Sequence, residues 1–340
     1  MIGKSGDFSR SLIEGLREPT LVVGQDGRVT LGNAAARKLL GDSVEGAVLS
    51  QVIAHPAATE WLERPEHAAA EEVELSALAR SRRHWLMRMA RLDDSQLLIR
   101  LIDRSETHAA EQMRVDFVAN ASHELRTPLS TLIGYTETLR EQGDEIDSET
   151  RQKFLTVVDE EAHRMQSVVE DLISLSRIEA ERFSTPTDAV DLGPLIGRVV
   201  ENGRRAANER GTSLDVDVAA DVPPIAADEG QILQLLDNLV TNALRYGTPG
   251  TPVTISAAAE GAMVHLIVAD EGEGIAPEHI KRVTERFYRV DTSRSRALGG
   301  TGLGLSIVKH IVERHRGRLT IESKVGVGTK MHVLLPVRAS

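Results

Sequence analysis

Short apolar runs separated by turn residues dominate roughly the first hundred residues, a pattern typical of strands joined by tight turns. The segment PTLVVGQDGRVTLGN at 19–33 predicts two strands on either side of a turn at Asp26 and Gly27. We expect one sheet carrying short helices over residues 10–103. Its other elements are a helix in AAARKLLG at 34–41 and strands at 83–92 and 95–103.

The next region has helical periodicity. From about residue 104 to 142 the only glycine is Gly134, and a turn, GDEID, follows at 143–147. A second helix is expected at about 148–183, so the two helices form an antiparallel hairpin. Because a lone hairpin buries little apolar surface, we expect two copies to form a four-helix bundle. The apolar positions of the first helix include Val115, Val118, Leu125, Leu129, Leu132, Tyr135 and Leu139.

Beyond the linker FSTPTDAVDLG at 183–193, helical and strand patterns alternate to Pro336. This predicts a multidomain α+β chain with domains at 1–103, 104–183 and 184–340, the last an α/β sandwich. In that domain, helices are expected at 192–210, 229–247 and 301–315, and strands at 212–219, 251–259, 263–272, 317–324 and 330–337.

Composition narrows the functional classes. Of 340 residues, 51 are acidic and 40 basic, and the net charge of −11 opposes a general nucleic-acid binder. No cysteine is present, which excludes disulfides, thiolate metal sites and cysteine nucleophiles. No apolar run approaches the roughly 18 residues that span a bilayer. We therefore expect a soluble, cytoplasmic chain without a membrane segment. A longer form with an upstream membrane anchor stays an open alternative.

One face of the expected helix at 229–247 carries polar side chains. Asn238, Asn242, Arg245 and Tyr246 follow one another at helical spacing. Asparagine is a mediocre helix former, so this face is either ordinary solvated surface or a binding face. The opposite face is apolar and consists of Leu235, Leu236, Leu239, Val240 and Leu244.

A first glycine loop follows an apolar strand in VADEGEGI, where Asp270 precedes Gly272 and Gly274. Glycines after a strand allow a ligand to approach the backbone closely. The aspartate can accept a hydrogen bond from an exocyclic amine. An ordinary turn is the alternative interpretation.

A second glycine loop, GGTGLGLSIVKHI at 299–311, opens a helix. Backbone N–H groups at such a start form an anion site, and the alternative is a flexible hinge. The polar and basic segment at 276–300, with Phe287 and Tyr288 as its aromatics, has the composition of a mobile lid over phosphates.

Together these elements resemble the N, G1, F and G2 boxes of the ATP-binding domain of sensor histidine kinases, a Bergerat fold. The resemblance implies ATP and Mg²⁺ as ligands. It places phosphate near Arg245, adenine near Tyr246 and the adenine amino group on Asp270. The implied nucleotide-binding residues are Asn238, Asn242 (also the Mg²⁺ ligand), Arg245, Tyr246, Asp270, Gly272, Gly274, Phe287, Gly300, Thr301, Gly302, Leu303 and Gly304.

The stretch FVANASHELRTPLS at 117–130 resembles the H box of the same family, which implies that His123 accepts a phosphoryl group. A neutral imidazole is a good nucleophile near neutral pH. Glu124 is expected to orient the ring and take up its proton, Thr127 to position a water for dephosphorylating a partner, and Pro128 to kink the helix. A lone helical histidine is otherwise a surface or packing residue, which is how we interpret the other histidines.

The first hundred residues resemble a PAS domain of the kind in phosphate-regulon sensor kinases. LIDRSE stands where that family often has Asp-x-Thr, and Ser105 replaces the threonine. The whole chain thus resembles a homodimeric, PAS-containing sensor histidine kinase that passes its phosphoryl group to an aspartate of a response regulator. The rival interpretations are a gyrase-type or chaperone-type ATPase, which lacks an H box, and a scaffold kinase without catalysis.

Overall fold

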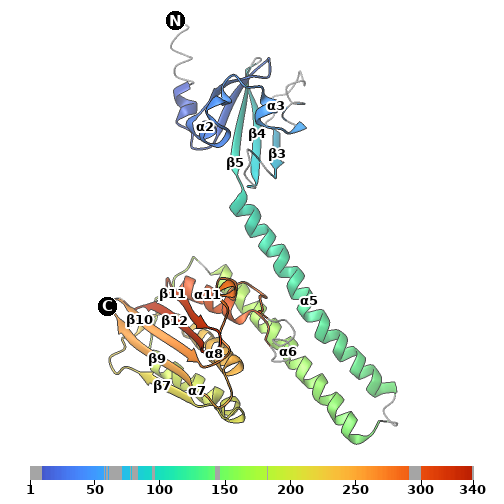
Figure 1. Ribbon diagram of the computed structural model, residues 1–340, viewed down its shortest axis with the longest axis vertical. Coiled ribbons are helices and arrows are strands. Elements are labelled where there is room, and N and C mark those ends of the chain that lie inside the picture. The colour runs from blue at the N-terminus through green and yellow to red at the C-terminus, as the bar shows by residue number, and fades with distance from the viewer. Residues whose placement is uncertain are drawn as a thin grey trace. The chain divides into compact units, whose positions relative to one another are not determined.

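The computed structural model describes residues 10–56, 58, 60, 71–76, 78, 83–93, 96–141, 146–181, 183–290 and 300–338. The chain divides into two compact units, Met1–Asp116 and Phe117–Ser340 (Figure 1). The boundary lies inside the long helix α5 (Ser105–Glu141), which begins just after the predicted end of the first domain. The division into three domains stays a prediction.

The first unit contains one antiparallel sheet with the strand order β2-β1-β5-β4-β3. The predicted turn joins β1 to β2, with Gly27 at a φ of 72°. Strand β3, which the sequence analysis did not predict, has the alternating pattern Glu-Glu-Val-Glu-Leu and pairs with β4. The strands are β1 (Thr20–Gly24), β2 (Val29–Gly32), β3 (Glu71–Leu75), β4 (Trp85–Asp93) and β5 (Gln96–Asp103).

Short helices lie between β2 and β3: α2 (Ala34–Leu40), which was predicted, and the 3-10 turn η1 (Asp42–Val44) and α3 (Leu49–Val52), whose positions were not. The fully buried Asn33 caps α2, because its Oδ1 accepts the N–H groups of Ala36 at 2.9 Å and Thr20 at 3.0 Å. One asparagine therefore joins the start of the helix to the first strand.

The predicted hairpin is formed by α5 and α6 (Ser148–Ala180), and most of its expected turn lies outside the described residues. Asp147 caps α6 by accepting the N–H of Thr150 at 2.9 Å. The rings of Tyr135 and Phe154 pack edge to face across the hairpin, 4.9 Å between centroids. Pro128 stands inside an uninterrupted helical segment, and the kink expected there stays a prediction.

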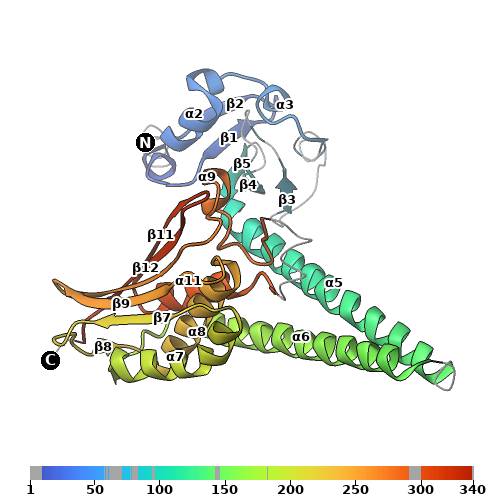
Figure 2. The ribbon, with the colours of Figure 1, turned by 60° about the horizontal axis from the view of Figure 1, so that its bottom comes forward.

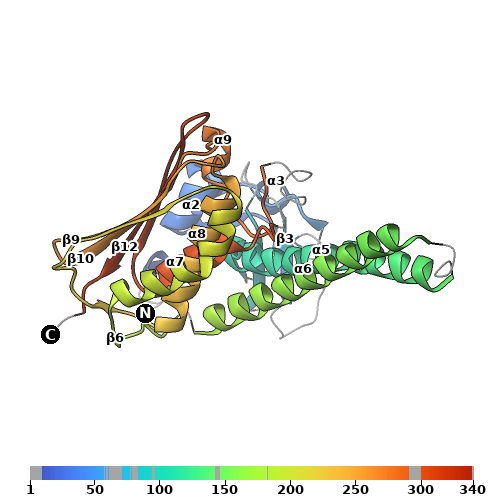
Figure 3. The ribbon, with the colours of Figure 1, turned by 90° about the horizontal axis from the view of Figure 1, so that it is seen from below.

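The rest of the second unit is an α/β domain. Its sheet has the order β11-β12-β10-β9-β7, in which only β7 and β9 pair in parallel. Helices α7 (Leu192–Glu209), α8 (Glu229–Tyr246) and α11 (Gly304–Arg314) lie on one side of this sheet (Figures 2 and 3). The strands are β7 (Leu214–Val218), β9 (Val253–Glu260), β10 (Met263–Asp270), β11 (Arg318–Lys324) and β12 (Gly328–Pro336).

These five strands and three helices were all predicted from the sequence. A two-stranded sheet of β6 (Ala189–Val190) and β8 (Ile225–Ala226) and the short helix α9 (Pro277–Ile280) were not. Leucine, isoleucine and valine side chains form the core, and the apolar residues of α8 (Leu235, Leu236, Leu239, Val240 and Leu244) are all buried in it. Among the described residues, no helix is both long and apolar enough to cross a bilayer.

Candidate functional site

A cavity of about 1030 Å³ lies between α8, the two glycine loops and α6. It brings together ten of the residues that the sequence analysis selected. These come from three segments that are far apart in the sequence: Asn238, Asn242, Arg245 and Tyr246; Asp270 and Gly274; and Gly300, Thr301, Gly302 and Gly304.

Helix α8 supplies the polar wall of the cavity. The helix begins at a cap in which Asp228 accepts the N–H of Gln231 at 3.1 Å, and its apolar face anchors it in the core. Asn238 donates from Nδ2 to the Gln234 carbonyl at 3.0 Å, while its Oδ1 faces the start of α11, where it would collide with a Cβ at Gly304. The polar face predicted for α8 therefore lines a cavity.

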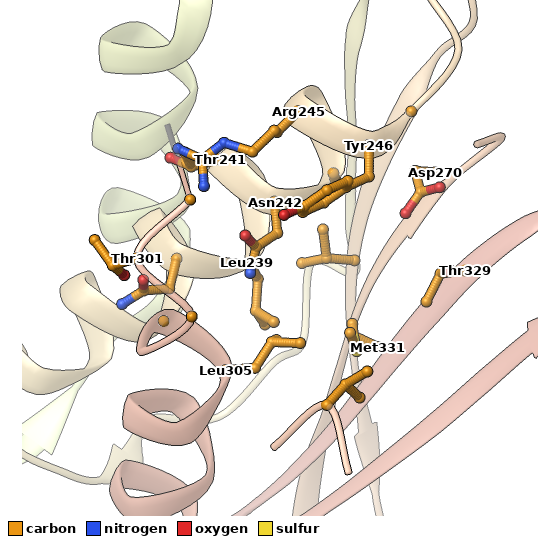
Figure 4. Close-up of a pocket in the computed structure, with 18 of the residues that line it drawn as sticks. Leu239, Thr241, Asn242, Arg245, Tyr246, Asp270, Thr301, Leu305, Thr329 and Met331 are labelled. Carbon is orange, nitrogen blue, oxygen red and sulfur yellow. The ribbon is translucent and has the colours of Figure 1, made fainter. Parts of the chain in front are cut away.

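Asp270 and Thr329 lie at one end of the cavity, and Arg245 and Thr301 at the other, with Asn242 between them (Figure 4). Burial raises the pKa of the Asp270 carboxyl, while the backbone N–H groups of Gly272 and Thr329 oppose this rise. The N–H of Gly272 donates to Asp270 Oδ1 at 2.9 Å. The cavity thus has an acceptor end and a cationic end.

Gly272 does not line the cavity but allows its walls to meet. It forms an isolated bridge with Gly247, and a Cβ at Gly272 would collide with the carbonyl oxygen of Tyr246. A glycine is required there because two backbone segments approach each other closely.

Phe287 and Leu303 also lie behind the lining. Gly302 has a φ of 74° and accepts the N–H of Phe287 at 2.8 Å, and Phe287 itself has a φ of 61°. The Phe287 ring lies 6.0 Å from the Phe117 ring of α5, measured between centroids, and Leu303 is fully buried. Both residues position the second glycine loop, and neither reaches the cavity.

Helix α6 contributes acidic side chains to the cavity that were not predicted from the sequence. Glu170 and Asp171 line the cavity, and Thr301 donates from Oγ1 to Asp171 Oδ2 at 2.7 Å. Burial raises the pKa of Asp171, the Thr301 hydrogen bond lowers it, Glu170 raises it and Arg245 lowers it. No local signal could have found these residues, because they belong to a helix 130 positions before the loop they contact.

Arg289 was missed as well, and it connects the cavity to the helix that carries His123. Its side chain is 5% exposed, lines the cavity, and places Nη2 at 2.9 Å from Glu124 Oε2. Arg164 of α6 approaches the same carboxylate at 3.8 Å.

His123 is exposed on α5, and Thr127 donates from Oγ1 to the His123 carbonyl at 3.4 Å. The expected contact between Glu124 and the His123 ring is not formed in this structure, where the carboxylate binds Arg289. Successive residues of a helix point in different directions, which favours this outcome.

A second set of contacts fixes the α/β domain to the end of α6. Arg286 pairs with Glu179, His310 lies 3.6 Å from the same carboxylate, and the Arg286 guanidinium stands 5.3 Å from the centre of the Phe117 ring. Of the predicted lid at 276–300, residues 291–299, including Gly299, lie outside the described residues. In the described part, His279 Nδ1 lies 2.7 Å from the hydroxyl of Tyr288.

The donor set of the cavity suits a hard cation shared with phosphates. The amide oxygen of Asn238 faces the start of the helix at Gly304, and Asn242 presents its Nδ2 to the same glycine. Oxygen ligands are those that Mg²⁺ prefers. Within the described ranges, no group of three or more histidine, aspartate or glutamate side chains could hold a metal ion by itself. A cation here would therefore need further ligands from outside the protein.

The sequence matches two protein families. Residues 227–339 match "Histidine kinase-, DNA gyrase B-, and HSP90-like ATPase", and residues 113–181 match "His Kinase A (phospho-acceptor) domain". The phosphate regulon sensor protein PhoR of Pseudomonas aeruginosa is 34% identical over 92% of this chain and 71% of its own length. The sensor-like histidine kinase SenX3 of Mycolicibacterium smegmatis is 38% identical over 72% of this chain, which spans 63% of that relative.

The sensor protein SrrB of Staphylococcus aureus is 30% identical over 98% of this chain, which spans 57% of its length. Solved structures show the same fold. The histidine kinase ThkA, crystallised with the response regulator protein TrrA, matches 96% of this chain and 97% of its own with a TM-score of 0.52 at 21% identity. Full-length ShkA, crystallised in complex with AMPPNP, matches 68% of this chain and 46% of its own with a TM-score of 0.50 at 28% identity.

Proposed function

Because this chain belongs to the sensor histidine kinases of two-component systems, we propose that His123 is the residue that its ATP-binding domain phosphorylates. One observation carries the assignment of the nucleotide site. The polar face of α8, Asp270 and the second glycine loop meet in a single cavity, although nothing in the local sequence requires them to meet.

Each end of the cavity suits one part of ATP. Asp270 is an acceptor for the exocyclic amino group of adenine, and the exposed ring of Tyr246 can lie against the base. Arg245 and the backbone N–H groups of the loop at Gly300 to Gly304 face the triphosphate. Asn242, with Asn238 beside it, would hold Mg²⁺, whose charge neutralises the phosphate oxygens when it is bound.

The reaction is a direct phosphoryl transfer. A neutral imidazole nitrogen of His123 forms the N–P bond to the γ-phosphorus, the bond from that phosphorus to the bridging oxygen breaks, and ADP leaves with the electron pair. The proton on the other ring nitrogen passes to solvent, to which His123 is exposed. The protein contributes positioning and charge more than covalent chemistry. Arg289 lines the nucleotide cavity and binds the residue next to His123, which makes it a candidate for aligning the two.

The remaining assignments rest on the same family. The antiparallel sheet with short helices after its second strand supports a PAS-type sensor module in the first unit. Exposed apolar side chains on α5 and α6 support a homodimer with a four-helix bundle. The phosphohistidine would pass its phosphoryl group to an aspartate of a response regulator, and Thr127 would position the water that reverses that modification.

Labelling with ATP radioactive at the γ-phosphate tests the proposal. Wild-type chain should acquire acid-labile, alkali-stable label, and His123→Gln should acquire none while it still binds a fluorescent ATP analogue. Asn242→Ala and Asp270→Ala should lose analogue binding. Label retained by His123→Gln would refute the acceptor, and unchanged analogue binding by both other variants would refute the nucleotide site.

A further inference from the structure

A row of four titratable side chains crosses the catalytic sheet on the face away from its three helices. The row consists of Glu260 on β9, His265 on β10, His332 on β12 and Glu322 on β11. His265 Nδ1 lies 3.0 Å from Glu260 Oε2, and His265 Nε2 lies 3.1 Å from His332 Nδ1. His332 Nε2 lies 3.4 Å from Glu322 Oε2. The proposed phosphoryl transfer uses none of these residues.

Strand alternation places the row opposite the nucleotide cavity. Val264, Leu266 and Val268 of β10 are buried on the helix side, so His265 points to the other face. On β12, Met331 and Val333 are likewise buried on the helix side, so His332 between them points to the other face. The two histidine side chains are 28% and 21% exposed, so solvent reaches them. Each of the four residues of the row can therefore be substituted without altering a residue that lines the cavity.

The contacts of the two histidine rings depend on how many ring nitrogens carry a proton. The three contacts are all hydrogen bonds only if the two rings share three N–H groups, with one proton held between His265 Nε2 and His332 Nδ1. The outer nitrogens each lie near a carboxylate, at 3.0 Å from Glu260 and 3.4 Å from Glu322. Removing the middle proton leaves two nitrogen lone pairs beside each other, while both outer N–H groups keep their partners.

We propose that this row binds a divalent transition metal ion, with His265 Nε2 and His332 Nδ1 as the ligands. Two nitrogens bound tetrahedrally to Zn²⁺ at about 2.0–2.1 Å lie roughly 3.3 Å apart, close to the separation seen here. Binding releases the shared proton to solvent, and the rings tilt until both lone pairs meet at the ion.

The two carboxylates strengthen this assignment. Histidines that bind metals usually donate their other ring N–H to a carboxylate, which fixes the tautomer and the ring orientation. Glu260 and Glu322 occupy these positions, one on each ring. The row therefore supplies the partners that orient the ligands as well as the ligands.

The two imidazole ligands determine which metal ions the site can bind. Imidazole nitrogens suit Zn²⁺, Cu²⁺ and Ni²⁺, whereas Mg²⁺ prefers oxygen. Because no described cluster holds three or more metal-binding side chains, water completes the coordination here. The site differs in this way from the Mg²⁺ site expected with ATP.

The test uses the full chain and Zn²⁺ in competition with a chromophoric chelator, followed by Cu²⁺ electron paramagnetic resonance. We expect one site that His265→Gln and His332→Gln each abolish, and a Cu²⁺ signal with coupling to two imidazole nitrogens. His163→Gln is the matched control, since His163 is exposed beside Asp159 but has no second histidine next to it. Zn²⁺ affinity unchanged by both row variants would overturn the proposal.

The carboxylates provide a second, independent readout. Glu260→Gln and Glu322→Gln should each weaken Zn²⁺ binding by roughly 10- to 100-fold, the usual effect of losing such a partner. Both positions are exposed, so these variants test the site even if a histidine variant folds poorly. Binding of the ATP analogue should stay unchanged in all four variants. Zn²⁺ affinity equal to wild type in both glutamine variants would contradict the assigned roles.

Discussion

At the scale of single residues, burial separates the histidines of this chain into different roles. His123 is exposed, whereas His315 is fully buried in the α/β domain. His315 accepts the N–H of Asp228 at Nε2, 3.0 Å away, and its Nδ1 lies 2.7 Å from the Ile311 carbonyl. Of the two roles expected for His315, surface or packing, it has the packing role, and a neutral ring satisfies both contacts.

His315 should make stability depend on pH. Burial lowers its pKa, so the unfolded chain binds the proton more tightly than the folded one. The free energy of unfolding should therefore fall as the pH drops below about 6.5, the ordinary histidine value. Urea unfolding of wild type and His315→Gln between pH 5 and 8 measures this, and a wild-type slope that the variant retains in full would exclude His315 as its source.

A substitution at Thr127 should separate autophosphorylation from dephosphorylation of the response regulator. Its hydroxyl lies one helical turn from His123 and donates a hydrogen bond to the backbone carbonyl of His123, so Thr127→Ala should spare autophosphorylation. Removal of phosphate from the regulator should slow. A phosphorylated receiver domain incubated with each protein provides the measurement, and Thr127→Ser, which keeps the hydroxyl, is the control. Equal dephosphorylation by Thr127→Ala and wild type would exclude the role.

At the scale of elements, local periodicity determined what could be predicted. The apolar and polar faces of α8 follow from spacing within one helix, so Asn238, Asn242 and Arg245 could be identified from sequence. The contacts of Asp171 and Arg289 could not, because each joins segments more than a hundred residues apart. Strand β3 was missed because three of its five residues are glutamates, which are uncommon in strands.

Asp171 should influence the affinity for ATP. Its carboxylate lies at the end of the cavity that carries Arg245 and the glycine loop, where it opposes the charge of a triphosphate. Asp171→Asn keeps an acceptor for Thr301 and removes the charge, so titration with a fluorescent ATP analogue should show several-fold tighter binding. Weaker binding by Asp171→Asn would mean that the carboxylate supports the nucleotide instead. Glu160→Gln, at an exposed position of the same helix, controls for net charge.

At the scale of the whole molecule, the hairpin leaves apolar surface uncovered in one chain. Leu129 and Ile133 of α5 are 46% and 48% exposed, and Val169 and Ile173 of α6 are 41% and 48% exposed. A second copy would bury these side chains, and each would contribute up to roughly 1.5–3 kcal/mol on full burial.

Negative charges introduced on this apolar surface should dissociate the dimer. Leu129→Glu combined with Ile133→Glu should shift sedimentation velocity from dimer to monomer, because the partner helices would desolvate the new carboxylates. Asn120→Glu adds charge to an exposed position about halfway round α5 from Leu129 and should leave the dimer intact. A dimer that persists in the double variant would place the interface elsewhere.

The hydrogen bond from Thr301 to Asp171 makes the position of α6 part of the binding equilibrium of the nucleotide cavity. Coupling between two equilibria is reciprocal. Any factor by which bound ATP weakens this contact therefore equals the factor by which the contact lowers the affinity for ATP. A tenfold factor corresponds to about 1.4 kcal/mol. A stimulus that shifts α6 can therefore set the occupancy of the cavity without touching the nucleotide, and the ATP concentration acts back on the helix with the same strength.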